Sequence, residues 1–325
     1  MNQNITFSIY KLEESKSIEE IYNNFSLNFS YPYEEVSKKY KYKLKSKDNI
    51  KNWNFESENY KYFYAFFEIE RPARELKNGT NFKEVKIFFF ENSKKEIYIL
   101  PFFNDVSLHI VIRVILSKYD YKFYKVISDN SKNLFSSWLH KFCRDEKVFE
   151  NFKITSVKSY KCTSNDQKST FKGRTDATIA ESIELRQKII YDQEFKNLKF
   201  AITYKNSYFD FTLSFTEEEY YKLSYFEKNL EGTLFKAEEK IEELLIFIVD
   251  FLIPKLKINF ILSKWDNKKH QEYRKILINE FKTELNQLEE IIAEENFEEK
   301  IEENCDIQKI SIKKEETKNK SFLFQ

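Results

Sequence analysis

Hydrophobic positions alternate with a period of two along most of the first two thirds of the chain. Residues Tyr60 to Ile69 read YKYFYAFFEI, which is typical of a central β-strand. Two apolar runs, Val85 to Phe90 and Glu96 to Leu100, flank a short polar segment and predict a β-hairpin. A second hairpin is predicted from Leu198 to Tyr204 and from Tyr208 to Phe215. This pattern indicates an antiparallel sheet.

Shorter strands and helices are predicted between these hairpins. The strands cover Thr6 to Lys11, Tyr121 to Ile127 and Phe152 to Tyr160. The helices cover Ser17 to Asn24, a buried segment from Asn104 or Asp105 to Tyr119, Ser131 to Phe142, and a segment from Thr175 or Asp176 to about Ile190.

Beyond Thr216 the hydrophobic period becomes helical. A helix is predicted to start at Thr216, and long amphipathic helices at Leu234 to Leu262 and Asp266 to Ala293. We therefore predict an α+β fold, in which an antiparallel sheet of mixed topology packs against helices and is followed by long C-terminal helices. The predicted domains are 1–215, with two lobes that would separate near 128–150, a helical domain 216–295, and a mobile charged tail 296–325.

Composition limits the classes of function more than it identifies one. The chain has 325 residues, of which 18% are aromatic and only 3 are glycine, so it lacks the parts of a glycine-rich nucleotide-binding loop. Its cysteines, Cys143, Cys162 and Cys305, form no C-x-x-C pair, which argues against a disulfide framework or a zinc site and predicts a cytoplasmic location. The most hydrophobic run, Leu244 to Leu262, is interrupted by charged residues and predicts a buried helix kinked at Pro254.

Charge is unevenly distributed although the net charge is +1. Seven lysines lie between Val36 and Trp53 against Asp48 alone, and tyrosines alternate with them. Such a mixture suits nucleic acid, because lysines meet phosphates and aromatic rings stack on bases. It equally suits an edge strand whose lysines resist aggregation. The predicted nucleic-acid contacts are Lys38, Lys39, Lys41, Lys43, Lys45, Lys172 and Arg174.

The last two of these residues flank Gly173 in the sequence FKGRTD. A glycine between Lys172 and Arg174, just before a predicted helix, is suited to hold a phosphate through backbone N–H groups and side-chain charge. An ordinary turn with Thr175 or Asp176 as the helix cap is the alternative.

Enzymatic sites are weakly supported by the sequence. Glu68 or Glu70 followed by Glu84 and Lys86 can be aligned with a PD-(D/E)xK nuclease, in which two carboxylates hold a metal beside a lysine. Paired surface charges on neighbouring strands explain the same residues. His140 lies three residues before Cys143, but this spacing alone does not make a base and a nucleophile. We therefore predict no catalytic residue, metal ligand or cofactor.

The order of elements in the first half, with an aromatic strand that ends near Arg71 and a hairpin that leads into the helix from Asn104, resembles small bacterial phage-exclusion proteins of the RexA-like type. The likeness covers about the first 220 residues and rests on the pattern of elements, with no motif that carries over a functional residue. It implies a non-enzymatic, DNA-binding and dimeric protein of bacterial antiviral defence.

Three hypotheses follow for the function. The first is a nucleic-acid-binding protein of a phage-defence or mobile-element conflict system. The second is a protein-interaction or inhibitor module, such as an anti-CRISPR-like protein or a defence adaptor, whose acidic C-terminal helices bind a partner or a second copy. The acidic charge is concentrated between Glu280 and Glu303, a segment that contains ten glutamates and only two lysines, Lys282 and Lys300. The third is the metal-dependent nuclease. The expected partners are therefore nucleic acid or protein, and no membrane.

Overall fold

A computed structural model describes most of the chain. The described residues are 2–13, 16–25, 30–35, 38–55, 57–70, 82–102, 121–124, 131–145, 149, 152–163, 170–174, 183–205, 207–215, 220–226 and 237–292. The chain divides into two compact units, residues 1–270 and 271–325.

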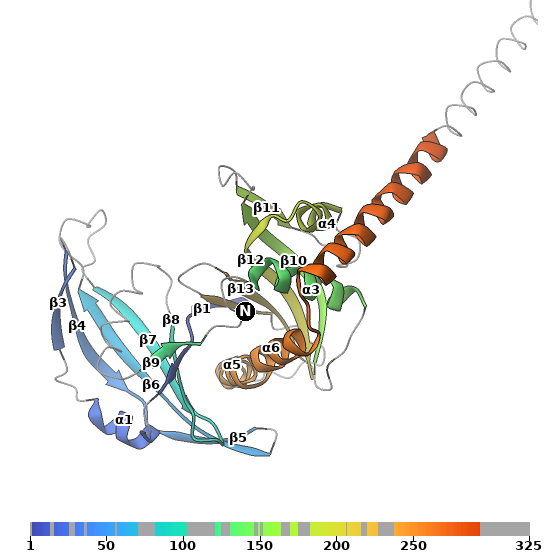
Figure 1. Cartoon of the computed structure of the whole chain (residues 1–325). Coiled ribbons are helices and arrows are strands. Elements are labelled where there is room, and N and C mark those ends of the chain that lie inside the picture. The colour runs from blue at the N-terminus through green and yellow to red at the C-terminus, as the bar shows by residue number, and fades with distance from the viewer. Residues whose placement is uncertain are drawn as a thin grey trace, which may run out of the picture. The chain divides into compact units, whose positions relative to one another are not determined.

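Fourteen strands in the described part of the first unit form one antiparallel sheet (Figure 1). They are β1 (Asn2–Phe7), β2 (Tyr10–Leu12), β3 (Ser30–Glu35), β4 (Lys38–Lys47), β5 (Lys51–Phe55), β6 (Glu58–Glu70), β7 (Phe82–Glu91), β8 (Ile97–Phe102), β9 (Tyr121–Phe123), β10 (Phe152–Thr163), β11 (Thr170–Arg174), β12 (Glu194–Tyr204), β13 (Ser207–Ser214) and β14 (Tyr221–Phe226).

The strand order gives this sheet two halves joined through β1. The order is β11-β10-β12-β13-β14-β1-β8-β7-β6-β4-β3, and β2, β5 and β9 pair off this path. Strand β1 pairs with β14 along its whole length but with β8 only at Phe7 and Phe102. The N-terminal strand therefore holds the two half-sheets together by a short stretch of ladder.

Helix α1 (Ile18–Asn24) covers one face of the first half-sheet. Ser17 and Glu20 form a capping box at its start, and the backbone N–H of Ile18 donates to the buried carboxylate of Glu91 at 3.1 Å. Beneath it Phe63 and Phe89 stack on neighbouring strands with ring centroids 4.7 Å apart. The alternation of YKYFYAFFEI places such residues on this face and leaves the tyrosines on the other.

A helical rod packs on that opposite, tyrosine-rich face. It consists of α5 (Ala237–Ile246), a π-helical segment η4 (Phe247–Leu252) and α6 (Ile253–Leu262). Tyr64 donates a hydrogen bond from its hydroxyl to Glu242 at 2.8 Å, and Tyr60 donates to Asp250 at 2.8 Å. Two tyrosine–carboxylate hydrogen bonds thus hold the rod to the first half-sheet.

The same rod also contacts the second half-sheet. The ring of Phe247 stacks on Tyr204 of β12 at 3.9 Å and meets Phe152 and Phe209 edge-on. The π segment ends directly before Pro254, which lies in the first turn of α6, and the N–H of Ile253 bonds five residues back to Ile248. The rod therefore links the two halves of the sheet.

Two shorter helices belong to the second half. Helix α3 (Lys132–Arg144) packs on β10 and β12, and α4 (Ile183–Ile190) precedes β12. A last helix spans residues 267–292 and begins after Asp266, whose carboxylate accepts the backbone N–H of Lys269 at 2.9 Å. No helix in the described part of the chain is long and apolar enough to cross a membrane.

The α+β fold, its antiparallel sheet and the two hairpins are confirmed. The helix predicted from Thr216 is wrong for residues 221–226, which form β14 and extend the sheet beyond residue 216. The edge-strand interpretation of 37–53 is wrong for Lys41 to Lys43, which pair with both β3 and β6. It holds for residues 51–53 of β5, which pairs with β6 alone among the described strands. The helix predicted to Tyr119, the segment 175–182 and the tail 296–325 lie outside the described residues.

Candidate functional site

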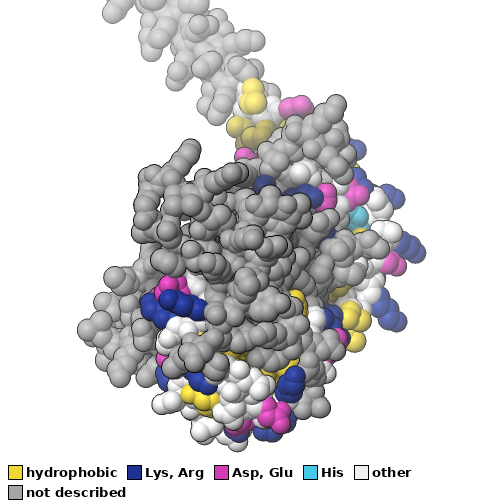
Figure 2. Space-filling model, turned by 90° about the vertical axis from the view of Figure 1, so that its left-hand side faces the viewer, with side chains coloured by type: hydrophobic (Ala, Val, Ile, Leu, Met, Phe, Trp, Pro, Cys, Tyr) yellow, Lys and Arg dark blue, Asp and Glu magenta, His cyan; other side chains and the backbone are white. Residues whose placement is uncertain are grey.

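Lys43 and Lys45 are the predicted β4 contacts whose side chains are described, and both are bound to glutamates, of β6 and β7 in turn. Lys43 Nζ lies 3.2 Å from Glu68 Oε1, and Lys45 Nζ lies 2.9 Å from Glu84 Oε2. On the face that Figure 2 shows, the described Lys and Arg side chains are likewise interspersed with Asp and Glu. These glutamates therefore neutralise part of the charge that the sequence offers to a phosphate backbone.

The other predicted lysines of β4 are described by their backbone alone. The register pairs Lys38, Lys39 and Lys41 with Glu35, Glu34 and Glu70, in that order. Acidic residues on both neighbouring strands thus lie opposite the basic strand, a cross-strand arrangement that favours intramolecular pairing.

Lys172 and Arg174 lie on a different part of the sheet. Both belong to β11, at one end of the strand order, whereas β4 is the last strand but one at the other end. The strands between them are β10, β12, β13, β14, β1, β8, β7 and β6. Gly173 pairs with Tyr160 of β10 and is therefore a strand residue, and the predicted helix start at Thr175 or Asp176 lies outside the described residues. The strand order gives the two predicted groups no shared stretch of ladder.

The residues proposed for a nuclease are engaged with other partners. Glu68 and Glu84 lie opposite each other on β6 and β7 and bind Lys43 and Lys45. The ammonium group of Lys86 lies over the ring of Tyr64, 3.7 Å from its centroid. Among the described residues, no three His, Cys, Asp or Glu side chains gather in a way that could hold a metal ion.

The cysteine alternative meets an unfavourable environment. Cys143 is a free, buried thiol on α3, and burial strongly raises its pKa. A raised pKa keeps the sulfur protonated near neutral pH, whereas the thiolate is the nucleophile. His140 lies on the same helix and is also buried.

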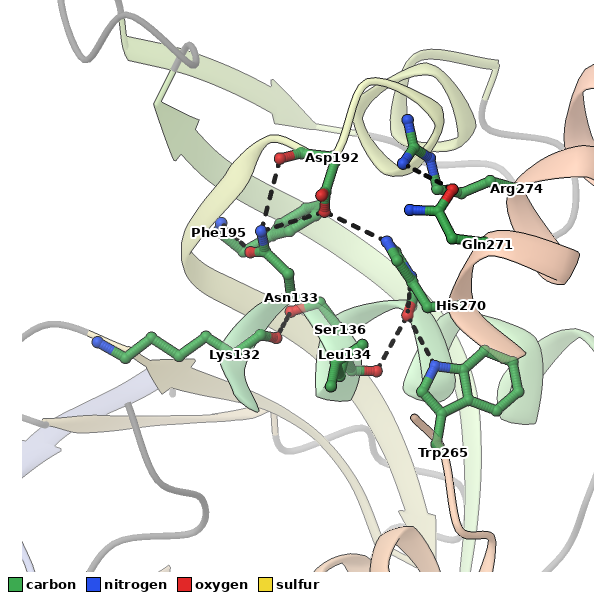
Figure 3. A network of polar contacts seen from close by, with 11 residues as sticks. Lys132, Asn133, Leu134, Ser136, Asp192, Phe195, Trp265, His270, Gln271 and Arg274 are labelled. Carbon is green, nitrogen blue, oxygen red and sulfur yellow. Dashed lines mark hydrogen bonds and ion pairs between the residues drawn. The ribbon is translucent and has the colours of Figure 1, made fainter. Parts of the chain in front are cut away.

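A second polar group was not anticipated from the sequence and is shown in Figure 3. We call it the His270 cluster; its members are Asn133 and Ser137 of α3, Asp192 of the turn before β12, Trp265 and His270. The His270 ring lies with Nδ1 2.8 Å from Ser137 Oγ and Nε2 3.2 Å from Asp192 Oδ1. A serine, a histidine and an aspartate thus lie in hydrogen-bond contact, as in a hydrolase triad.

The surroundings of Ser137 oppose a catalytic role. Its side chain is 1% exposed, so a substrate cannot approach the hydroxyl. The Ser137 hydroxyl also donates a hydrogen bond to the carbonyl of Leu134 at 3.0 Å, and its oxygen accepts one from the indole N–H of Trp265 at 3.0 Å. With His270 these contacts use the full hydrogen-bonding capacity of a serine hydroxyl. The cluster instead joins α3 to the chain around Trp265 and His270.

The turn at Asp192 completes this connection. Asp192 has a φ of 52°, a left-handed conformation that is uncommon for a residue with a side chain. Asn133 donates to the carboxylate of Asp192 at 3.3 Å and accepts the N–H of Phe195 at 3.4 Å. These bonds orient the carboxylate toward His270. The cluster therefore has a structural role, because it holds α3, the turn at Asp192 and His270 together.

Helix 267–292 carries a row of exposed hydrophobic side chains. We call it the apolar row and define it as Leu285, Leu288, Ile291 and Ile292, which are 55%, 53%, 49% and 55% exposed. Their spacing of three and four residues places them on one side of the helix. The helical period predicted the helix, but its exposed hydrophobic residues were not identified from the sequence. Their spacing of three and four residues within a segment rich in glutamate is the sequence signal that could have identified them.

Neither a comparison with protein-family models nor one with curated proteins finds a match for this chain. The assignment of a function therefore depends on the geometry of the chain itself.

Proposed function

We propose that this protein is a non-enzymatic interaction protein that binds another protein through the apolar row of helix 267–292. The observation that carries the proposal is the exposure of four large aliphatic side chains, each about half exposed, within eight residues of one helix. Single exposed apolar residues are ordinary, whereas a contiguous apolar patch rimmed by polar residues is typical of an interaction site.

The residues around the row support a protein partner. The apolar side chains follow the spacing with which a helix packs into a groove or against another helix. Glu284 and Glu289 border them, and acidic residues at the rim repel nucleic acid and anionic surfaces. A protein surface that is apolar at its centre and basic at its rim would complement this helix.

The proposal can be tested by the native size of the protein in extracts of producing cells. The variant Leu285→Gln/Leu288→Gln removes half of the row and retains good helix formers. The control Ile276→Gln removes an aliphatic residue that is 48% exposed but lies outside the row. We expect the wild type and the control to migrate as an assembly and the row variant as a species near 39.6 kDa. Equal sizes for all three would refute the proposal.

Nucleic-acid binding remains the second candidate, favoured by one observation. The side chains of Lys43 and Lys45 are 57% and 54% exposed despite their glutamate partners. Exposed ion pairs are weak, so phosphates could compete for these lysines. Titration of single- and double-stranded DNA and RNA at low salt tests this, and Lys43→Ala/Lys45→Ala should lower the salt dependence of binding. Absence of salt-sensitive binding in the wild type would eliminate this candidate.

The cellular setting remains a prediction. Antiviral defence rests on the resemblance to RexA-like proteins alone, and the cytoplasmic location rests on the pattern of cysteines. The described cysteines, Cys143 and Cys162, are both buried thiols.

A further inference from the structure

We propose that the partner of the apolar row is a second copy of this chain, bound with its helix antiparallel. This inference rests on the proposed function, because it takes the row to be a protein-binding surface and specifies what occupies it.

The hydrophobic positions of helix 267–292 follow a coiled-coil repeat. Ile278, Phe281, Leu285, Leu288 and Ile292 are separated by three, four, three and four residues, which is the spacing of alternating a and d positions. Two heptads are thus filled with large apolar side chains. Such a seam is typical of a helix that pairs with another helix of the same kind.

An antiparallel pair brings complementary apolar layers together. When Leu285 of one copy faces Leu288 of the other, the two-fold symmetry repeats the same contact on the other side of the axis. The next layer outward then places Phe281 against Ile292 in both symmetric positions. Four consecutive layers, formed by Phe281, Leu285, Leu288 and Ile292 of each copy, are therefore apolar.

The charges beside the seam favour this orientation. In an antiparallel pair, residues at the e positions face each other, which brings Lys282 of one copy opposite Glu289 of the other, twice by symmetry. Both side chains are exposed on the helix and can reach across the seam. Two attractive contacts thus flank the apolar layers.

A parallel pair would meet repulsion at the same place. There the g position faces the following e position, so Glu284 of one copy would lie opposite Glu289 of the other, again twice. The repulsion between these like charges disfavours the parallel dimer. The same Glu289 is therefore attractive in one orientation and repulsive in the other, which makes it the residue to test.

The experiment is sedimentation equilibrium of the purified full chain with a series of charge variants. Glu289→Lys should weaken the dimer by about ten-fold, because it turns both attractive contacts into repulsive ones. Lys282→Glu should weaken it to a similar degree. The double variant Lys282→Glu/Glu289→Lys should restore the affinity, since it exchanges the two charges without changing their sum.

The parallel alternative gives the opposite result for one variant. Glu289→Lys would then place a lysine opposite Glu284 and strengthen the dimer, which would overturn the antiparallel orientation. A wild type that stays monomeric at every concentration would overturn self-association altogether. If the native assembly still depends on Leu285 and Leu288 in that case, the proposed function stands with a different partner; if it does not, both proposals fail.

Discussion

Substitution of Tyr64 by Phe isolates the hydrogen bond that fastens the helical rod to the first half-sheet. The phenol and the carboxylate of Glu242 are 3% and 7% exposed at the residue level, and their oxygens are 2.8 Å apart. The other oxygen of that carboxylate, Oε2, is buried without a hydrogen-bond partner among the described residues. Loss of the Tyr64 hydroxyl would remove its hydrogen bond to the Glu242 carboxylate.

The expected cost is large for the removal of one oxygen atom. A hydrogen bond to a charged group contributes about 1.5–3 kcal/mol, and a buried charge that loses its partner costs about 3–5 kcal/mol. Because local rearrangement can relieve the unpaired charge, we expect Tyr64→Phe to lower the free energy of unfolding by about 2–4 kcal/mol. The burial that makes the bond strong also raises the pKa of the Tyr64 hydroxyl, as does the neighbouring Glu242.

Tyr60→Phe is a matched control, because the same atom is removed from the same strand. Its hydroxyl also donates at 2.8 Å, to Asp250, but that carboxylate is only half-buried and keeps the side-chain amide of Asn92 at 2.9 Å. We therefore expect a cost of only about 1 kcal/mol.

Urea unfolding followed by circular dichroism measures both variants against the wild type. Equal slopes with respect to urea would show that the midpoints can be compared directly. Equal losses for Tyr64→Phe and Tyr60→Phe, or a loss at Tyr64 below about 1 kcal/mol, would refute the reasoning. A loss that small at Tyr64 would mean that its hydrogen bond contributes little to the attachment of the rod.

Three further perturbations test other parts of the fold. Phe247→Ala removes a buried ring that links the rod to the second half-sheet and should lower the free energy of unfolding by about 3–5 kcal/mol in urea titrations. His270→Ala should lower the free energy of unfolding by about 1–3 kcal/mol and change the fluorescence of Trp265, because both residues belong to one hydrogen-bonded cluster. An unchanged free energy of unfolding would contradict a structural role for the cluster. Burial alone would raise the pKa of Glu96, but hydrogen bonds, first from Lys11, lower it overall, so its stabilising contribution is present at neutral pH and is lost as the pH falls through the lowered value. Glu96→Gln should therefore differ most from the wild type near neutrality and least well below pH 4.5, as pH-dependent unfolding would show.

Local patterns along the sequence predict the strands and helices more successfully than their arrangement. The aromatic run from Tyr60 to Ile69 is rich in strand-forming residues, so its strand character follows from local sequence, and a period of two assigns Tyr60, Tyr62 and Tyr64 to one face. The error at 221–226 has a physical cause. The acidic run Glu217 to Glu219 is typical of a helix start, whereas the buried Tyr221 and Leu223 alternate as strand residues that fill a place between β13 and β1.

The candidate sites depended on contacts between distant segments. Nothing near Lys43 or Lys45 in the sequence indicates that Glu68 and Glu84 will lie opposite them, since this follows from strand order. The His270 cluster joins residues 78 and 133 positions apart, which no local spacing reveals. The seam of helix 267–292 is the exception, because a heptad is a local pattern and its residues can be identified from spacing alone.

Site-specific photocross-linking tests most directly whether the apolar row is a protein-binding surface. A photoreactive amino acid would replace Leu288 on the row and, as the control, the exposed Glu290 on the opposite side of the same helix. The account predicts a covalent protein adduct from position 288 and none from position 290, and the mass of the adduct would distinguish a second copy from another protein. The absence of an adduct from position 288, or equal adducts from both positions, would contradict it.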